Sequence, residues 1–341
     1  YLHQLGYAGD GMLIGVIDAG FFHADRLPAF DSLWINNQII GYKDFVDASS
    51  DIFEQSTHGM MVLSIMGGNM PDSLVGTAPK ASYLLLRSED ASTENLVEED
   101  NWVAAIEYAD SAGVDVVNSS LGYTTFDDST IVRTYADMTG RISRASLAAT
   151  IAARRGMILC ISAGNSAENS WHFIGVPADA DSVLTVGAVD VERNYASFSS
   201  VGPSADGRVK PDVSTMGLGT YVQNTDSLVT YGNGTSFSAP VLTGTVACLW
   251  QAFPNKSNFE IMDAVRRSAS QFNNPDTLLG YGIPNFQTAY QLLLPNGISV
   301  FNTTRQKLIT FPNPVGENQL MMLSFYSPDY CTANVVVLNS L

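Results

Sequence analysis

The stretch Gly234-Thr235-Ser236-Phe237-Ser238-Ala239-Pro240 decides the interpretation of the whole chain. The uncharged apolar run at residues 241–250 follows it and predicts a buried helix that begins near Ser236. Backbone N–H groups at a helix N-terminus favour developing negative charge, which suits a serine that attacks a carbonyl carbon. An isolated Ser236 or Ser238 at such a place is more often only a helix N-cap. The choice between nucleophile and cap therefore depends on residues elsewhere in the chain.

Composition and charge narrow the class of protein. Of the 341 residues, 45% are hydrophobic and 15% charged, which predicts a packed globular protein. The net charge of −17, from 17 basic and 34 acidic residues, argues against nucleic acid or an anionic membrane as the main partner. The longest uncharged stretch, residues 227–255, is interrupted by polar residues, Gly and Pro, so no membrane span is expected.

The N-terminus and the cysteines give two further expectations. Tyr1-Leu2-His3-Gln4 lacks a signal-peptide pattern, so we expect any targeting segment to have been removed or to lie outside this sequence. The three cysteines, Cys160, Cys248 and Cys331, are far apart and odd in number, so no disulfide framework is expected. Cys160 and Cys248 lie in apolar runs, which favours buried free thiols over a catalytic or metal-binding role.

Three polar residues lie at the ends of predicted elements. Asp18 follows the apolar run at residues 12–17, a predicted buried parallel strand, and open α/β sheets keep their chemistry at such strand ends. His58 follows Thr57, a candidate N-cap, and opens a predicted buried helix. Asn165 comes after the predicted strand at residues 157–162. Taken singly, Asp18 is more typical of a turn and His58 of a satisfied core histidine, and Asn165 is either a turn former or an amide donor to an oxyanion.

Strands alternate with helices through about the first 250 residues. The expected strands are residues 12–17, 38–46 (at an edge), 82–87, 114–118, 157–162 and 182–189. The expected helices are residues 58–66, 102–109 and 142–155 and the helix that begins near Ser236. Such alternation predicts an α/β fold with a mainly parallel sheet covered by helices on both faces.

Asp18, His58 and Ser236 supply, in that order, the carboxylate, base and nucleophile of an acyl-transfer triad. With Asn165 added, residues 10–290 resemble the subtilisin-like serine proteases, the subtilase family (peptidase family S8), in which subtilisin has the same order. Five segments carry the resemblance in the family's order: residues 16–20, 57–59, 119–122, 162–165 and 234–240. Met60-Met61, Thr215-Met216-Gly217 and Phe237 depart from the family's usual residues.

The resemblance implies a three-layer subtilisin-like fold and a secreted serine endopeptidase that forms an acyl-enzyme. His58 would take the hydroxyl proton of Ser236 while Asp18 holds the imidazole. The Asn165 side chain would stabilise the oxyanion. The substrate main chain would bind as an added strand, and the substrate-binding residues implied are Ser120, Leu121, Gly122, Ala163 and Gly164.

The acidic triplet Glu98-Glu99-Asp100 precedes the predicted helix at residues 102–109. In the resemblance, this segment borders the pockets for residues two and four positions upstream of the cut. We therefore expect Asp100 to contribute to substrate binding and to favour basic upstream residues. The alternative is a solvated cap, because carboxylates at a helix N-terminus complement its dipole.

The character of the chain changes after residue 294. Residues 308–311, 321–325 and 333–338 are strand-like, and Pro312-Asn313-Pro314 is a predicted turn. This segment resembles the opening of the C-terminal sorting domain that Bacteroidota attach to cargo of their type IX secretion system; the alternative is a small β-appendage. The predicted domains are a peptidase domain, residues 1–294, and a β-rich C-terminal extension, residues 295–341. The resemblance implies a bacterial protein, secreted or at the cell surface, with the secretion machinery as a partner.

The resemblance implies no cofactor for the chemistry. Subtilases commonly carry structural calcium, but no clean ligand loop is visible in the sequence. Either Asp44, Asp47 and Asp51 or the acidic triplet could contribute ligands, so the metal ligands stay unassigned. The expected partners are protein or peptide substrates and a removed propeptide.

Two other functions use the same motifs. A non-catalytic subtilase-fold protein would hold peptide in its cleft without cutting it. The usual sign of such a protein is loss of a triad residue, and none is lost here. Acyl transfer to an amine in place of water needs the same triad and also stays open.

Overall fold

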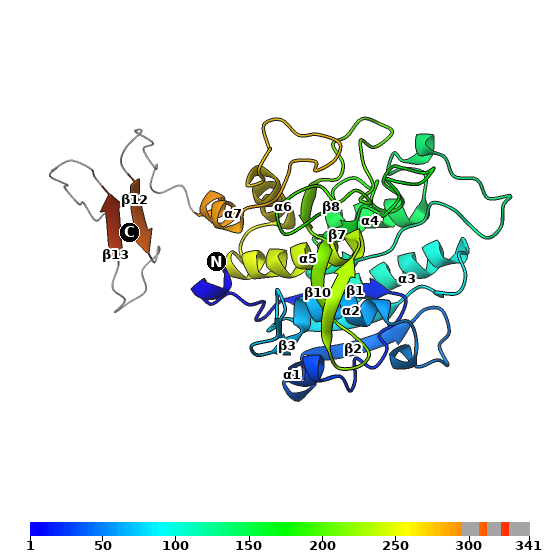
Figure 1. Cartoon of the computed structure of the whole chain (residues 1–341), viewed down its shortest axis with the longest axis horizontal. Helices are drawn as coiled ribbons and strands as arrows, with labels where there is room; N and C mark the ends of the chain where they lie inside the picture. The colour runs from blue at the N-terminus through cyan, green and yellow to red at the C-terminus, as the bar shows by residue number, and fades with distance from the viewer. Residues whose placement is uncertain (295–306, 312–321, 327–341) are drawn as a thin grey trace. The chain divides into compact units, whose positions relative to one another are not determined.

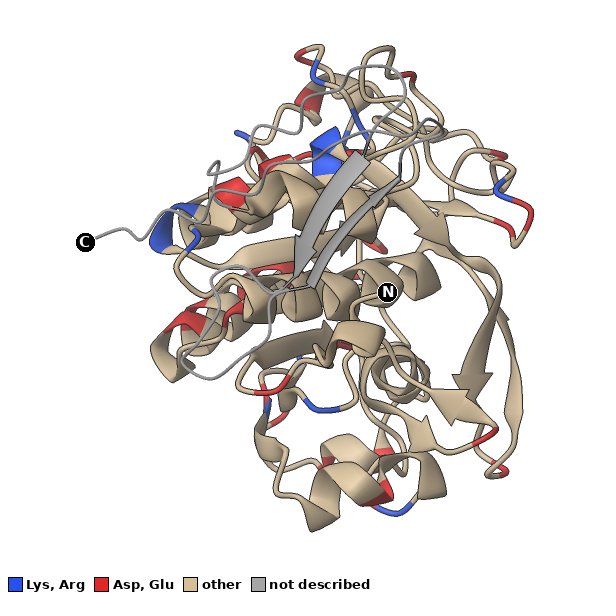
Figure 2. Cartoon of the chain, turned by 90° about the vertical axis from the view of Figure 1, so that its left-hand side faces the viewer, with Lys and Arg blue, Asp and Glu red and all other residues tan. Residues whose placement is uncertain are grey.

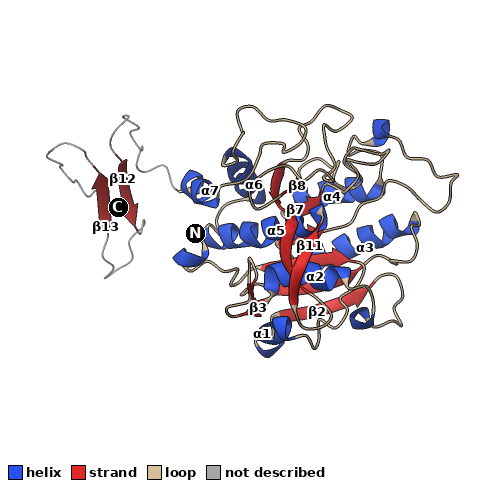
Figure 3. Cartoon of the chain, viewed as in Figure 1, coloured by secondary structure: helices blue, strands red, loops and turns tan. Residues whose placement is uncertain are grey.

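The computed structural model describes residues 1–294, 307–311 and 322–326. The chain divides into two compact units, Tyr1–Leu293 and Leu294–Leu341, next to the boundary expected at residue 294 (Figure 1). In the first unit, a seven-stranded sheet lies among helices (Figure 3). Every neighbouring pair in that sheet is parallel, which confirms the α/β prediction. The strand order is β2 (Ile39–Asp44), β5 (Ser82–Arg87), β1 (Leu13–Asp18), β6 (Val116–Ser119), β7 (Ile158–Ser162), β8 (Leu184–Val189) and β9 (Val213–Met216).

Two hydrophobic cores make the three layers. The first core joins one face of the sheet to helices α2 (His58–Gly67), α5 (Thr235–Ala252), α6 (Asn258–Arg267) and α7 (Phe286–Leu293). The second joins the other face to α3 (Val97–Ala112) and α4 (Arg144–Arg155). Successive side chains of β1 point to opposite faces of the sheet. Ile14 and Val16 therefore lie in the first core, and Ile17 lies in the second. The predicted three-layer architecture is therefore confirmed.

Smaller elements complete the first unit. Helix α1 (Asp31–Ile35) and three 3₁₀ turns, η1 (His3–Leu5), η2 (Pro28–Phe30) and η3 (Ile52–Glu54), precede α2, and η4 (Tyr135–Asp137) precedes α4. Two hairpins are formed by β3 (Asn69–Met70) with β4 (Leu74–Val75) and by β10 (Leu218–Gln223) with β11 (Val229–Asn233). The second hairpin leads directly into α5.

The second unit contains one described hairpin. Strands β12 (Lys307–Phe311) and β13 (Met322–Tyr326) are antiparallel, with Leu308 opposite Phe325. They match the first two strands expected in the C-terminal extension. The turn expected at Pro312 and the third strand, residues 333–338, lie outside the described residues.

The first unit has an acidic surface and two buried cysteines. Acidic residues lie on several helices and loops of the first unit (Figure 2). Cys160 and Cys248 are buried free thiols, as predicted, and burial raises the pKa of each to about 12. Among the residues that the structure describes, no helix is both long enough and apolar enough to cross a membrane.

A buried charge cluster ties β8, β9 and α6 together. The Asp212 carboxylate accepts bonds from Lys210 Nζ at 2.8 Å and from Arg266 Nε at 2.7 Å, and the backbone N–H of Thr185 at 2.9 Å adds a third. Lys210 and Asp212 are only 3% and 5% exposed. Burial alone would raise the pKa of Asp212, but the charges of Lys210 and Arg266 lower it to about 2.

Asp212→Asn is expected to destabilise the fold strongly. The substitution leaves the Lys210 ammonium buried without its counter-charge, which costs about 3–5 kcal/mol of unfolding free energy. Urea unfolding at neutral pH would measure the loss. The control is Asp263→Asn, which removes the exposed pair with Arg267 and is expected to cost under about 1 kcal/mol. Equal stability of the two variants would contradict the prediction.

Candidate active site

Asp18 and His58 meet where β1 ends and α2 begins. The imidazole Nδ1 lies 2.7 Å from Asp18 Oδ1, which also accepts the Ala19 backbone N–H at 2.8 Å. Asp18 is fully buried, whereas the His58 side chain is 30% exposed. Burial lowers the pKa of His58, but the charge and hydrogen bond of Asp18 outweigh it, so the net pKa is raised from its ordinary 6.5. The structure thus brings the two predicted residues together.

The start of α2 differs from the prediction in one detail. Thr57 occupies the N-cap position, but its side chain makes no capping hydrogen bond and its backbone is already in the helical region. The Ser56 hydroxyl instead accepts the His58 N–H at 3.2 Å. At Gly59, an added Cβ would lie 2.4 Å from the Gly20 carbonyl oxygen and 2.8 Å from Asp18 Cβ. Only glycine permits this close approach of α2 to the end of β1.

Ser236 lies in the first turn of α5, as predicted. Its Oγ donates to the Ser120 carbonyl at 3.3 Å, and Ser120 Oγ donates to the Ser236 carbonyl at 2.9 Å. In the described part of the chain, no hydrogen bond joins Ser236 Oγ to His58. The neighbouring Phe237 ring nevertheless lies 6.0 Å from the imidazole, centroid to centroid, so the helix begins beside His58. Catalytic hydrogen bonds often tighten only when substrate is bound.

The Asn165 amide has a fixed orientation. Its Oδ1 accepts both the Thr235 backbone N–H at 2.8 Å and the Thr235 hydroxyl at 3.0 Å. Because the oxygen faces these two donors, the Nδ2 group is the end left to donate elsewhere. An amide donor beside a serine at a helix N-terminus is suited to hold an oxyanion.

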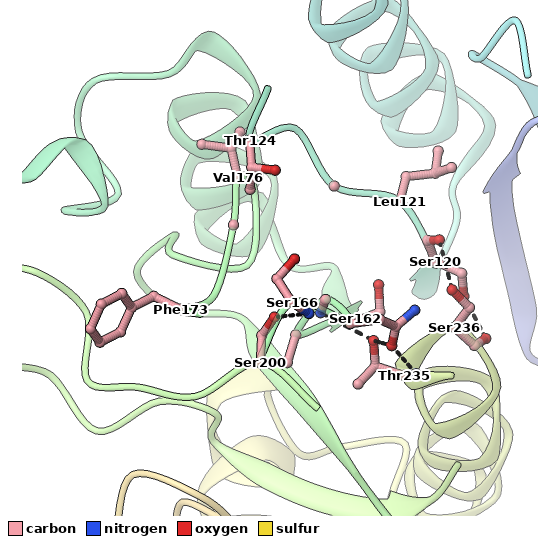
Figure 4. Close-up of a pocket in the computed structure, with 15 residues that line it drawn as sticks. Ser120, Leu121, Thr124, Ser162, Ser166, Phe173, Val176, Ser200, Thr235 and Ser236 are labelled. Atoms are coloured by element: carbon pink, nitrogen blue, oxygen red, sulfur yellow. Dashed lines mark hydrogen bonds between the residues drawn. The ribbon is translucent and has the colours of Figure 1, made fainter. Parts of the chain in front are cut away.

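A cavity of about 180 Å³ opens beside these residues. Figure 4 shows Ser120 and Ser236 together at one end, with Ser166 and Ser200 side by side elsewhere in the lining. Of the predicted site residues, the lining includes Ser120, Leu121, Gly122, Ala163, Gly164, Asn165 and Ser236. It does not include Asp100.

Sequence reasoning missed part of this cavity. The additional lining residues are Thr124, Ser162, Ser166, Phe173, Gly175, Val176, Ser200 and Thr235. Tyr123 N–H donates to the Val176 carbonyl at 2.8 Å, and this bridge brings two loops far apart in sequence into one wall. Thr235 and Ser162 belong to motif segments and could have been found, whereas the loop around Val176 has no local signal.

The acidic triplet is engaged away from the cavity. Glu99 accepts from Arg133 at 2.5 Å and from the Ser143 hydroxyl at 2.6 Å, and Asp100 pairs with Arg144 at 2.6 Å. Glu98 and Glu99 are each 2% exposed, so the solvated-cap alternative is wrong for these two residues. Glu99 and Asp100 are therefore paired with arginines, while the expected preference for basic upstream residues stays a prediction.

The candidate calcium ligands are also bonded to protein groups. Asp44 pairs with Arg87 at 2.9 Å and accepts the Ser50 hydroxyl, Asp47 accepts Ser49, and Asp51 caps η3. Across residues 1–294, 307–311 and 322–326, no group of three His, Cys, Asp or Glu side chains is placed to hold a metal ion. The carboxylates of Asp44, Asp47 and Asp51 are thus engaged by protein groups and do not form a ready calcium site.

An Asp–His pair, a serine at a helix N-terminus and a parallel α/β sheet together define a serine hydrolase arrangement. The sequence pattern of the Subtilase family, Peptidase_S8, matches residues 9–282, and the chain belongs to this family. It is a serine endopeptidase of the subtilisin-like class.

Individual relatives agree with this assignment. Subtilisin NAT of Bacillus subtilis subsp. natto is 30% identical over 296 residues, which cover 85% of this chain and 68% of that protein. Subtilisin DY of Bacillus licheniformis is 30% identical, with 84% and 93% of the two chains covered. The solved structure of MycP1 with its N-terminal propeptide removed has a TM-score of 0.66 at 24% identity, covering 86% of this chain and 95% of that one. At this identity, the last similarity shows the fold alone.

Proposed function

We propose that this serine endopeptidase cuts peptide bonds with Asp18, His58 and Ser236 as its triad and Asn165 in its oxyanion hole. The observation that carries the proposal is the 2.7 Å contact from His58 Nδ1 to the buried Asp18, with Ser236 at the start of α5. In acylation, His58 Nε2 takes the Ser236 proton as Oγ attacks the carbonyl carbon. Asp18 holds the tautomer with the proton on Nδ1 and stabilises the imidazolium.

The resting position of Ser236 Oγ requires one movement. The hydroxyl donates to the Ser120 carbonyl, so it must turn out of this hydrogen bond toward His58 before proton transfer. A substrate strand along Ser120, Leu121 and Gly122 would offer its own N–H to that carbonyl. Substrate binding would thereby favour the rotated serine, because the substrate replaces the hydroxyl as the donor.

Asn165→Ala is expected to lower kcat about a hundred- to a thousandfold while KM stays nearly constant. The reason is that Nδ2 would stabilise the oxyanion, which exists only after attack. Asn165→Asp preserves shape but removes the donor, so it should lose at least as much activity. Steady-state kinetics on one peptide substrate would measure both variants. A loss confined to KM would instead indicate a role in ground-state binding.

We further propose that the enzyme is bacterial and secreted or held at the cell surface. The support is the resemblance of the C-terminal segment to a type IX sorting domain. Expression of the complete gene in a host with that secretion system, with and without residues 295–341, would test this by fractionation. A removable propeptide is proposed from the similarity to MycP1.

Two measurements on the intact chain test the catalytic proposal. A fluorophosphonate probe should label one serine, and digestion of an unfolded protein should give fragments cut at internal bonds. Labelling without cleavage of any substrate would favour acyl transfer to an amine. A folded sample that binds peptides but shows neither reaction would establish the non-catalytic alternative.

A further inference from the structure

We infer that the cavity beside Ser236 selects an uncharged, hydrogen-bonding side chain at the residue whose carbonyl is attacked, with glutamine as the side chain that fits. This inference rests on the proposed function, because it names the substrate for that same site. The cavity is lined by Ser236, by Asn165 and by Ser120, Leu121 and Gly122. A carbonyl placed between Ser236 Oγ and Asn165 Nδ2 would therefore direct the side chain of its own residue into the cavity.

Serine and threonine hydroxyl groups make the cavity lining polar but uncharged. Figure 4 shows Ser162, Ser166 and Ser200 close to one another, and Thr124 near Val176 elsewhere in the lining. Ser200 is fully buried, and its Oγ accepts the Ser166 N–H at 2.9 Å, which leaves the hydroxyl proton to donate. Within residues 1–294, the hydroxyls of Ser162 and Ser166 make no hydrogen bond to the protein. They are available to both halves of a carboxamide, because a hydroxyl donates and accepts.

The lining contains no charged side chain. A lysine or glutamate side chain would therefore enter without a counter-charge, and an unpaired buried charge is costly. An apolar side chain would enter at lower cost, but it would leave the Ser162 hydroxyl, which has no hydrogen-bond partner in the described protein, without one. An uncharged polar side chain avoids both penalties.

The cavity is large enough to hold a glutamine side chain. Its volume of about 180 Å³ leaves room for the five non-hydrogen atoms of a glutamine side chain. Thr124 narrows the space, since a Cβ added at Gly175 would lie 2.7 Å from Thr124 Cγ2. The Phe173 ring does not fill it, because it points away from the other labelled residues and stacks on Tyr135 at 3.9 Å (Figure 4).

The inference can be tested with three peptides that differ only at the residue whose carbonyl is attacked. Glutamine, methionine and glutamate have similar length and differ in polarity and charge. We expect kcat/KM for glutamine to exceed that for methionine about tenfold, the value of one or two net hydrogen bonds, with glutamate the poorest of the three. Ser162→Ala should reduce the glutamine-to-methionine ratio severalfold by lowering the rate on glutamine. Ser111→Ala, which alters a hydroxyl exposed on α3, should leave the ratio unchanged.

The outcomes separate this inference from the proposed function. If the enzyme is labelled by fluorophosphonate and cuts the methionine peptide as well as or better than the glutamine peptide, the inference is wrong and the triad stands. An unchanged ratio in Ser162→Ala would likewise remove the role of that hydroxyl. If the chain is neither labelled nor active on any of the peptides, the proposed function fails and the inference fails with it.

Discussion

Ser236→Ala is expected to abolish fluorophosphonate labelling and to lower kcat about a million-fold. Members of a serine triad act as a unit, so removing the nucleophile alone loses nearly the whole contribution of the triad. The alanine lacks only one oxygen, and the hydrogen bond lost with it, to the Ser120 carbonyl at 3.3 Å, is long. The fold should therefore survive, and the bond from Ser120 Oγ to the backbone carbonyl of residue 236 should persist.

The same motif supplies a matched control in Ser238. This serine is fully buried in the next part of α5, and its Oγ donates to the Thr235 carbonyl at 2.9 Å. Ser238→Ala should therefore keep probe labelling and most of the activity. Labelling that persists in Ser236→Ala, or that is lost only in Ser238→Ala, would show that the wrong serine has been assigned.

Asp18→Asn is expected to lower kcat about ten-thousandfold near neutral pH, because the amide favours the wrong imidazole tautomer. Asp18 Oδ2 is buried without a hydrogen-bond partner among the described residues, so the contact to His58 passes through Oδ1 alone. The exposed Asp10 provides a control, and Asp10→Asn should be as active as the unmodified chain.

The pH profile gives this variant a second readout. His58 must be neutral to accept a proton, and the Asp18 charge raises its pKa, so activity of the unmodified chain should fall as pH drops through a value above 6.5. Removing that charge lowers the pKa of His58, so the residual activity of Asp18→Asn should persist to lower pH. An acid limb that does not move, measured as kcat/KM against pH, would contradict the proposed role of Asp18.

The sequence predicted the elements with strong local signals. The apolar runs before Asp18 and after Ser236 match β1 and α5 to within about a residue or two, the usual uncertainty of element ends. Helix α6 was missed although Ser257 and Glu260 form a capping box at its start. Strands β9, β10 and β11 were also missed, since they are short and interrupted by Gly and polar residues. The β10–β11 hairpin depends on distant support, such as the 3.0 Å bond from Gln223 N–H to Ser64 Oγ on α2.

The sequence by itself determined the α/β class, the family resemblance and the identity of the four candidate catalytic residues. The α/β class follows from the periodic alternation of strands and helices. The resemblance, and with it the four candidate residues, follows from five motif segments that occur in the family's order. Only the tertiary structure decided the partners of the acidic triplet and the composition of the cavity. Glu99 and Asp100 are paired with Arg133 and Arg144, which are 34 and 44 residues away in sequence. Such contacts form only when loops and helices pack on the sheet. The local pattern of apolar and polar residues therefore does not predict them.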